Sequence, residues 1–173
     1  ASFVVQSKVI TKLNPVLFWK SEEFRFYIKI IAVVSILLAA FLYCESQYSI
    51  SHALTAAFYQ VLSLSTTTGS SSENYHLWTL DAKIVLFISM FLSSCAGSAG
   101  GGLKMTRWLL IVKYIKNEMY KILHPNAVMS IKIDNVSVSG IVVKQTIFFM
   151  LCYFGIFAFT AFLITLTIFS SSF

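Results

Sequence analysis

Charged residues are scarce in this 173-residue chain. They make up 12% of it, whereas 57% of the residues are hydrophobic. Soluble domains average about 25% charged and about 45–50% apolar residues. The imbalance argues against a water-soluble enzyme, a disordered tail and a nucleic-acid-binding arm, although the formal net charge is +6. It predicts a membrane protein, in which excess Lys and Arg gather on the cytoplasmic side.

Several signatures of chemistry are also missing. The three cysteines, Cys44, Cys95 and Cys152, lie far apart with no CxxC spacing, so neither a metal site nor a disulfide framework is indicated. The phosphate-binding pattern GxxxxGK[ST] and the serine-hydrolase pattern GxSxG do not occur. The apolar segments hold no nucleophile–base pair and no metal cluster. We therefore expect neither an enzyme nor a bound cofactor.

Three apolar stretches are long enough to cross a bilayer as helices. They cover residues 26–44, 84–103 and 145–169. At 1.5 Å per residue the first reaches about 28 Å, close to the bilayer core of roughly 30 Å. A fourth apolar stretch, residues 53–64, is too short to span. The predicted fold is an all-α membrane protein with three spans and one short helix between the first two.

The basic residues divide unequally among the segments that join these spans. Twelve of the 13 lie in residues 1–29 and 103–146, and only Lys83 lies in residues 45–83. By the positive-inside rule, residues 1–25 and 121–144 are predicted to be cytoplasmic and residues 45–83 external. We expect a multi-pass protein of the plasma membrane.

The short helix leads into a run of small hydroxyl residues. Residues 63–72 read Ser-Leu-Ser-Thr-Thr-Thr-Gly-Ser-Ser-Ser. Alone, such a run is more often an external loop behind an interfacial helix. Between two spans, however, a short helix followed by such a strand is the layout of a pore loop, because irregular backbone at membrane depth must line protein or water. We predict a pore helix at 52–64 and a selectivity filter at 65–70.

The predicted filter needs no side-chain chemistry. The C-terminus of the pore helix would direct partial negative charge at it. An extended backbone through Thr66, Thr67, Thr68 and Gly69 would offer carbonyl oxygens that replace the water shell of a cation, with Ser70 completing the site. Gly69 suits a backbone with unusual dihedral angles.

A glycine-rich run closes the second long span. Its members are Gly97, Ser98, Ala99, Gly100, Gly101 and Gly102. Glycine costs a helix about 1 kcal/mol relative to alanine, so the helix should break in this run. Close packing of small residues against another helix is one interpretation. The other is an intramembrane loop that lines the pore and acts as its gate.

Basic residues follow this run. Lys104 and Arg107 are three positions apart and share one side of a helix. They either extend to the membrane interface or set the electrostatics of the inner mouth of the pore. The basic helix should end at His124-Pro125. Residues 131–138 then predict a small hairpin with its turn at Asp134-Asn135.

Four motifs together resemble the Trk/Ktr family of potassium-uptake proteins. They are Ser65-Thr66-Thr67-Thr68-Gly69, Asn74-Tyr75 with Trp78, the run from Ala96 to Lys104, and Leu123-His124-Pro125-Asn126-Ala127-Val128. Glu23-Phe24-Arg25 before the first span is also similar to that family. The resemblance covers essentially the whole chain, whose ends do not look like natural termini, so we expect a fragment of a longer protein.

The resemblance implies four helix–pore loop–helix repeats around one pore. Residues 1–25 would then be a cytoplasmic lead-in and residues 26–121 the third repeat, with a broken span at 84–120. Residues 122–144 would be a cytoplasmic linker and residues 145–169 the first helix of the fourth repeat.

The resemblance also implies what the protein does. The ion would be K⁺, with Na⁺ as the alternative, bound at the carbonyls of residues 66–69, and the gate would be residues 97–102. The resemblance also implies a homodimer in the bacterial inner membrane, regulated by a cytoplasmic ring of nucleotide-binding subunits, with no nucleic-acid partner. Ser70 departs from the bulky or aromatic residue that many members place after the filter glycine.

Two alternative functions are a subunit of a two-span homotetrameric channel and a membrane scaffold without transport. The third long span and the absence of TVGYG disfavour the channel subunit.

Overall fold

The computed structural model describes residues 19, 21–45, 48–95, 98, 101–124, 130–134 and 136–171. Within these ranges the chain is mainly helical, with one short 3₁₀ turn and two short strands. It divides into two compact units, residues 1–109 and 110–173. Helix α6, Met105–Leu123, begins in the first unit and continues into the second.

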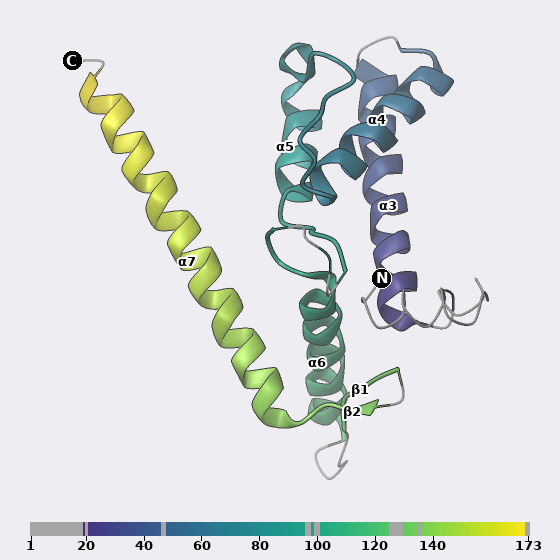
Figure 1. The fold of residues 1–173 in the computed structure, drawn as a ribbon, viewed down its shortest axis with the longest axis vertical. Helices are drawn as coiled ribbons and strands as arrows, with labels where there is room; N and C mark the ends of the chain where they lie inside the picture. Colours follow the sequence, from purple (N-terminus) through teal and green to yellow (C-terminus); the bar gives the residue numbers. More distant parts are fainter. Residues whose placement is uncertain are drawn as a thin grey trace. The chain divides into compact units, whose positions relative to one another are not determined.

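The first unit is built on three helices that contact one another (Figure 1). These are α3 (Glu22–Glu45), α4 (Ile50–Ser65) and α5 (Leu80–Ser89), and the 3₁₀ turn η1 (Tyr75–Leu77) precedes α5. Two glutamates, Glu22 and Glu23, occupy the first turn of α3, where the helix dipole favours negative charge. With 24 residues, α3 is about 36 Å long, which is enough to cross the bilayer core.

Small residues let α4 approach α3 closely. The buried face of α4 repeats with helical period and consists of Ala53, Ala56, Ala57, Gln60, Val61, Ser63 and Ser65. Leu38 and Leu42 of α3 belong to the same core and are fully buried. Because the alanines present little more than backbone, α4 can lie directly against these leucines. The predicted pore helix, residues 52–64, lies inside α4.

The predicted second long span breaks earlier than its sequence indicated. Helix α5 ends at Ser89, and the described residues between it and α6 are not helical. The last turn tightens, because Phe91 N–H donates to Ile88 O at 3.2 Å and Leu92 N–H donates to Ser89 O at 3.0 Å. The prediction that this span stays helical as far as the glycine run is therefore wrong.

The second unit holds the rest of α6, a hairpin and one long helix. Strands β1 (Lys132–Ile133) and β2 (Val136–Ser137) pair antiparallel, which confirms the predicted hairpin. Asp134 adopts a left-handed φ of +49° at the turn, and Asn135 lies outside the described residues. Helix α6 ends at Leu123, directly before His124, as predicted.

Helix α7, Gly140–Ser171, is apolar on all sides and almost entirely exposed. No charged residue follows Lys144 within it. A helix with no polar face is stable only where lipid or other protein covers it. In the described part of the chain, α3 and α7 are the two helices long and apolar enough to cross a membrane. The predicted spans at 26–44 and 145–169 lie inside them.

Candidate ion filter and intramembrane loop

The first candidate filter residues form the end of α4. Thr66 is the C-cap, with φ −85° and ψ −2°, and Thr67 has a left-handed φ of +57°. Thr67 N–H donates to Leu64 O at 3.0 Å, and Thr68 N–H donates to Ser63 O at 3.0 Å. This pair of bonds is the Schellman arrangement that closes many helices. The prediction of an extended backbone is therefore wrong for Thr66 and Thr67.

Two left-handed residues set the path of this segment. Gly69 has φ +72°, which confirms that its position needs unusual dihedral angles. Thr67 was not anticipated, because a β-branched residue is rarely found at positive φ. A Schellman arrangement usually has glycine at this position.

Four consecutive backbone carbonyls at the end of α4 have no hydrogen-bond donor in the described part of the chain. Among the described residues, none of the carbonyl oxygens from Thr66 to Gly69 accepts a hydrogen bond. The carbonyl of Ser70 differs, because Ser63 Oγ donates to it at 2.5 Å. All five residues from 66 to 70 are exposed. The segment therefore holds four consecutive carbonyl oxygens, on exposed residues, that are not used in hydrogen bonds within the described residues.

Side chains from both sides hold this segment in place. Tyr27 Oη of α3 and Ser65 Oγ at the end of α4 share a hydrogen bond at 3.3 Å. Tyr59 Oη and Ser70 Oγ share another at 3.0 Å. These contacts fix the segment at its beginning and at its end, so the carbonyls between them keep a defined direction.

The loop that follows the filter is tied to the start of α4. His52 Nε2 and Glu73 Oε1 lie 3.1 Å apart, and the Tyr48 ring stacks on the imidazole at a centroid distance of 5.0 Å. Trp78, part of the family resemblance, is 4% exposed and belongs to the core of α3, α4 and α5. The loop after the candidate filter is thereby held against α4 and the core of the first unit.

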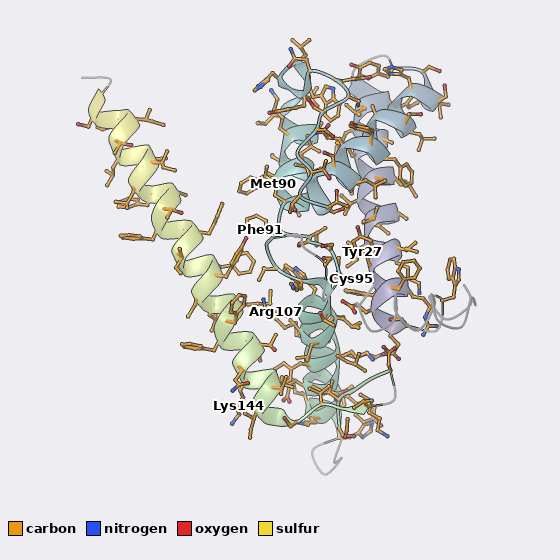
Figure 2. All side chains as sticks on the ribbon, viewed as in Figure 1. Tyr27, Met90, Phe91, Cys95, Arg107 and Lys144 are labelled. Atoms are coloured by element: carbon orange, nitrogen blue, oxygen red, sulfur yellow. The ribbon has the colours of Figure 1, made fainter. Side chains whose placement is uncertain are left out.

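The described residues on either side of the glycine-rich run are hydrogen-bonded to one another and largely buried. Ser93 N–H donates to Leu103 O at 3.3 Å, and Met105 N–H donates to Ser94 O at 3.2 Å. Ser93 Oγ also donates to the carbonyl of Gly101. Leu103 and Met105 are fully buried. Figure 2 shows Phe91 and Cys95 on the same loop, between α5 and α6.

Only part of the predicted gate can be described. Ser98, Gly101 and Gly102 lie in the described part of the chain, whereas Gly97, Ala99 and Gly100 do not. Gly102 has φ +86°, and a Cβ added there would lie 3.4 Å from the Cβ of Ser93. The left-handed backbone therefore favours glycine at this position, whereas the contact with Ser93 is at ordinary van der Waals distance.

Lys104 and Arg107 lie at the start of α6. Lys104 immediately precedes its first residue, and Arg107 N–H donates to Lys104 O at 2.9 Å. Both side chains are half-buried. Positive charge at a helix N-terminus interacts unfavourably with the helix dipole. Helix stability therefore does not explain why two basic residues occur at the start of α6.

Sequence reasoning missed the residues that close the loop stem. Ser93 and Ser94 form its bonds, and Trp108 Nε1 donates to Phe91 O at 3.2 Å across it. Two adjacent serines just before a glycine run, inside an apolar segment, were the available signal. Buried hydroxyl groups require partners, and here the Ser93 hydroxyl bonds to the backbone of Gly101 and the Ser94 hydroxyl to the side chain of Ser98.

Comparison with known proteins decides the family. The model of a family described as "TrkH: Cation transport protein" matches residues 16–171. The chain belongs to the TrkH family. Its relatives include the Trk system potassium uptake protein TrkH of Escherichia coli K12, which is 37% identical over 119 residues covering 68% of this chain and 25% of that protein. The TrkH of Vibrio parahaemolyticus is 30% identical over 155 residues, covering 84% of this chain and 32% of that protein.

A solved TrkH structure supports the helical membrane fold. The crystal structure of the potassium transporter TrkH from Vibrio parahaemolyticus matches with a TM-score of 0.83 and 30% sequence identity. The match covers 91% of this chain and 34% of that chain. This chain thus spans about a quarter to a third of the length of these TrkH proteins, and the predicted fold class is confirmed.

Replacing Thr67 with glycine should stabilise the protein by about 1 kcal/mol. A left-handed backbone costs an L-residue about 1–2 kcal/mol, part of which is offset by the greater freedom of glycine when unfolded. The Thr67 hydroxyl has no hydrogen-bond partner among the described residues. The substitution therefore changes only the conformational free energy of the backbone at this position. Thermal unfolding of the full-length protein in detergent measures the shift. Thr68→Gly is the matched control and should destabilise; equal shifts for the two variants would contradict the argument.

Proposed function

We propose that this chain forms part of a K⁺-conducting pathway through the membrane. The observation that carries the proposal is the row of four carbonyls from Thr66 to Gly69, which accept no hydrogen bond within the described residues. Carbonyl oxygens of this kind replace the hydration shell of a potassium ion in selective pores. The ion is the transported substrate, bound at these carbonyls, and Ser70 holds the end of the filter through its bond to Ser63.

Electrostatics support a cation at this position. The last turn of α4 contains no basic residue, so the partial negative charge of the helix end is not neutralised there. The end of α4 leads directly into the four carbonyls. A short re-entrant helix that points its C-terminus at an ion is the arrangement expected for a pore helix.

The proposed pathway continues to the glycine-rich loop. Residues 26–121 make up one helix–pore loop–helix repeat, and α7 begins the next. Residues 97–102 obstruct the path below the filter and act as its gate, and Lys104 and Arg107 set the potential at the inner mouth. The distribution of Lys and Arg supports an orientation in the plasma membrane with residues 1–25 and 121–144 in the cytoplasm.

The partners of the full-length protein are also proposals. We propose a homodimer, regulated by a cytoplasmic ring of nucleotide-binding subunits that docks on the basic inner surface. The relatives are named as members of a Trk system, which is consistent with additional subunits. Light scattering of the purified protein measures the oligomeric state, and a tetramer would favour the two-span channel alternative.

Flux measurements test the proposed function. The full-length protein that contains this chain should carry K⁺ into liposomes along its gradient, and Na⁺ should enter more slowly. A fluorescent dye sensitive to membrane potential reports the movement of each ion, and empty liposomes provide the baseline. K⁺ movement at the baseline rate would contradict the proposal and would favour a membrane scaffold without transport.

A further inference from the structure

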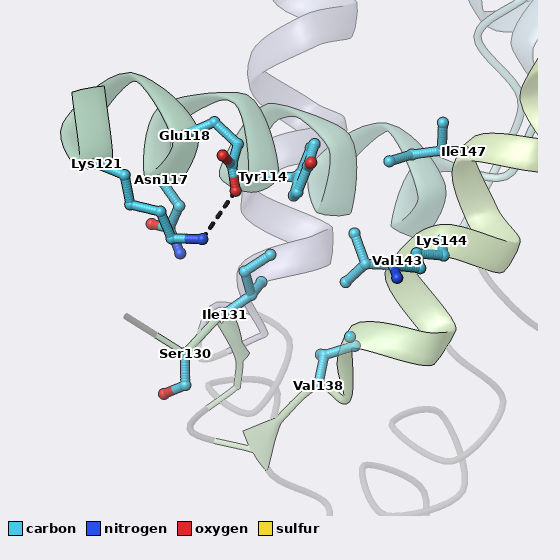
Figure 3. Close-up of a pocket in the computed structure, with 11 residues that line it drawn as sticks. Tyr114, Asn117, Glu118, Lys121, Ser130, Ile131, Val138, Val143, Lys144 and Ile147 are labelled. Atoms are coloured by element: carbon cyan, nitrogen blue, oxygen red, sulfur yellow. Dashed lines mark hydrogen bonds and ion pairs between the residues drawn. The ribbon is translucent and has the colours of Figure 1, made fainter. Parts of the chain in front are cut away.

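A cavity of about 420 Å³ lies within the second unit, between α6, the hairpin and the first turns of α7 (Figure 3). Both polar and apolar side chains line it. Asn117 and Lys121 of α6 contribute polar groups, whereas Val143 and Ile147 of α7 contribute apolar surface. The proposed filter and gate involve none of these residues.

Two lysines of the lining differ in whether a carboxylate pairs with them. Lys121 Nζ lies 2.9 Å from Glu118 Oε1, which also lines the cavity. The carboxylate therefore neutralises the positive charge of Lys121. Lys144 is exposed, and no carboxylate pairs with it among the described residues. The lining therefore carries a net positive charge, and Lys144 holds the part that is not neutralised.

A further lysine fixes one wall of the cavity. Lys113 Nζ donates to Lys132 O at 2.6 Å, which connects α6 to strand β1. This bond positions the hairpin next to α6, where Ile131 and Val138 complete the lining. The cavity is thus held by contacts within the unit.

The cavity lies at the boundary between charged and apolar sequence in α7. Lys144 is the last charged residue of that helix, and Ile147 follows one turn later. A lysine at this boundary extends toward the water side of a membrane, whereas the residues beyond it face acyl chains. A ligand in this cavity would therefore have its polar end toward the cytoplasm and its apolar end toward lipid.

We infer that this cavity binds the headgroup of an anionic phospholipid. The Lys144 ammonium group and the Asn117 amide contact the phosphate, and Val143 and Ile147 contact the glycerol and the first acyl carbons. Basic pockets beside membrane helices on the cytoplasmic side are suited to such headgroups. The inference rests on the membrane placement of α7 from the proposed function, but not on ion conduction.

Native mass spectrometry of the full-length protein tests the inference. The protein is released from micelles that contain phosphatidylglycerol or phosphatidylcholine, and the fraction with bound lipid is measured. Phosphatidylglycerol should be retained in preference to phosphatidylcholine. Lys144→Gln should weaken its retention about fivefold, as expected for one lysine near a lipid phosphate, and Lys144→Arg should preserve it.

A change at Glu118 should act in the opposite direction. Glu118→Gln removes the carboxylate that pairs with Lys121, so Lys121 becomes available and lipid retention should rise severalfold. Both side chains are partly exposed, so the variant is expected to fold. Unchanged or weaker retention in Glu118→Gln would overturn the inference.

Lys116→Gln is the matched control, since this exposed lysine of α6 does not line the cavity. It should leave lipid retention unchanged. An effect equal to that of Lys144→Gln would indicate general surface attraction and overturn the inference.

Displacement of the lipid by inorganic phosphate would indicate a site for a free anion and would overturn the inference of a lipid headgroup. Because lipid binding is measured directly, its loss with intact K⁺ flux would contradict this inference alone, and lost flux with intact lipid binding would contradict only the proposed function.

Discussion

Replacing Gly69 with valine is expected to reduce the selectivity of the full-length protein for K⁺ over Na⁺ between about fivefold and thirtyfold. A left-handed backbone costs an L-residue about 1–2 kcal/mol, and a β-branched residue more, so the segment would relax to another conformation. Relaxation turns the neighbouring carbonyls of Thr68 and Gly69 away from a common ion. The measurement is the ratio of K⁺ to Na⁺ flux in liposomes.

The structure distinguishes backbone strain from steric blockage at this position. A Cβ added at Gly69 would meet no atom within 4 Å, so the chain itself leaves room for a side chain. The effect should therefore follow tolerance of positive φ, with asparagine least harmful, alanine intermediate and valine most harmful. Equal loss in all three variants would instead indicate an obstruction by parts of the pore outside this chain.

Gly155→Val is the matched control for this series. Gly155 lies inside α7, and a Cβ added there also meets nothing within 4 Å. It is not among the glycines with positive φ, so the same substitution imposes no left-handed strain. Selectivity should remain at the wild-type value. If Gly155→Val reduces selectivity as much as Gly69→Val, the filter assignment loses its support.

Two of the three long spans could be predicted from the hydrophobic pattern of the sequence. Uninterrupted apolar sequence placed the spans that lie in α3 and α7, and Asp134-Asn135 indicated the hairpin turn. These features depend on local sequence, since hydrophobic length and turn chemistry act within one element. The unusual backbone dihedral angles of Gly69 were predicted correctly for the same reason, because glycine is itself a local signal for positive φ.

The details of the candidate site depended on contacts that sequence does not contain. Thr67 adopts positive φ because two hydrogen bonds to Ser63 and Leu64 close the helix around it, and threonine gives no local sign of this. Helix α5 ends at Ser89, ahead of the glycines, where Ser93 and Ser94 bond to residues on the far side of the loop. Tertiary bonding thus overrode an apolar run that favoured continued helix.

Shortening the glycine-rich loop is expected to raise ion flux severalfold, because the loop obstructs the path beneath the proposed filter. Deletion of residues 98–100 shortens the glycine-rich run and retains Gly101 and Gly102, which contact Ser93. Ser93→Ala keeps the loop length but removes the hydroxyl that holds Gly101, so it should raise flux to a smaller extent. Single-exponential rates of K⁺ entry into liposomes report both changes.

A buried serine outside the stem separates gating from general damage to the protein. Ser89 is fully buried, like Ser93, but its hydroxyl donates at 2.6 Å to Leu86 within its own helix. Ser89→Ala should therefore leave flux unchanged while costing similar stability, since each variant loses one buried hydrogen bond worth about 1 kcal/mol. Flux that rises equally in both serine variants would trace the effect to loosened packing. If the deletion leaves flux at the wild-type rate, the glycines serve close packing of the loop against its stem, and the gate must lie elsewhere along the path.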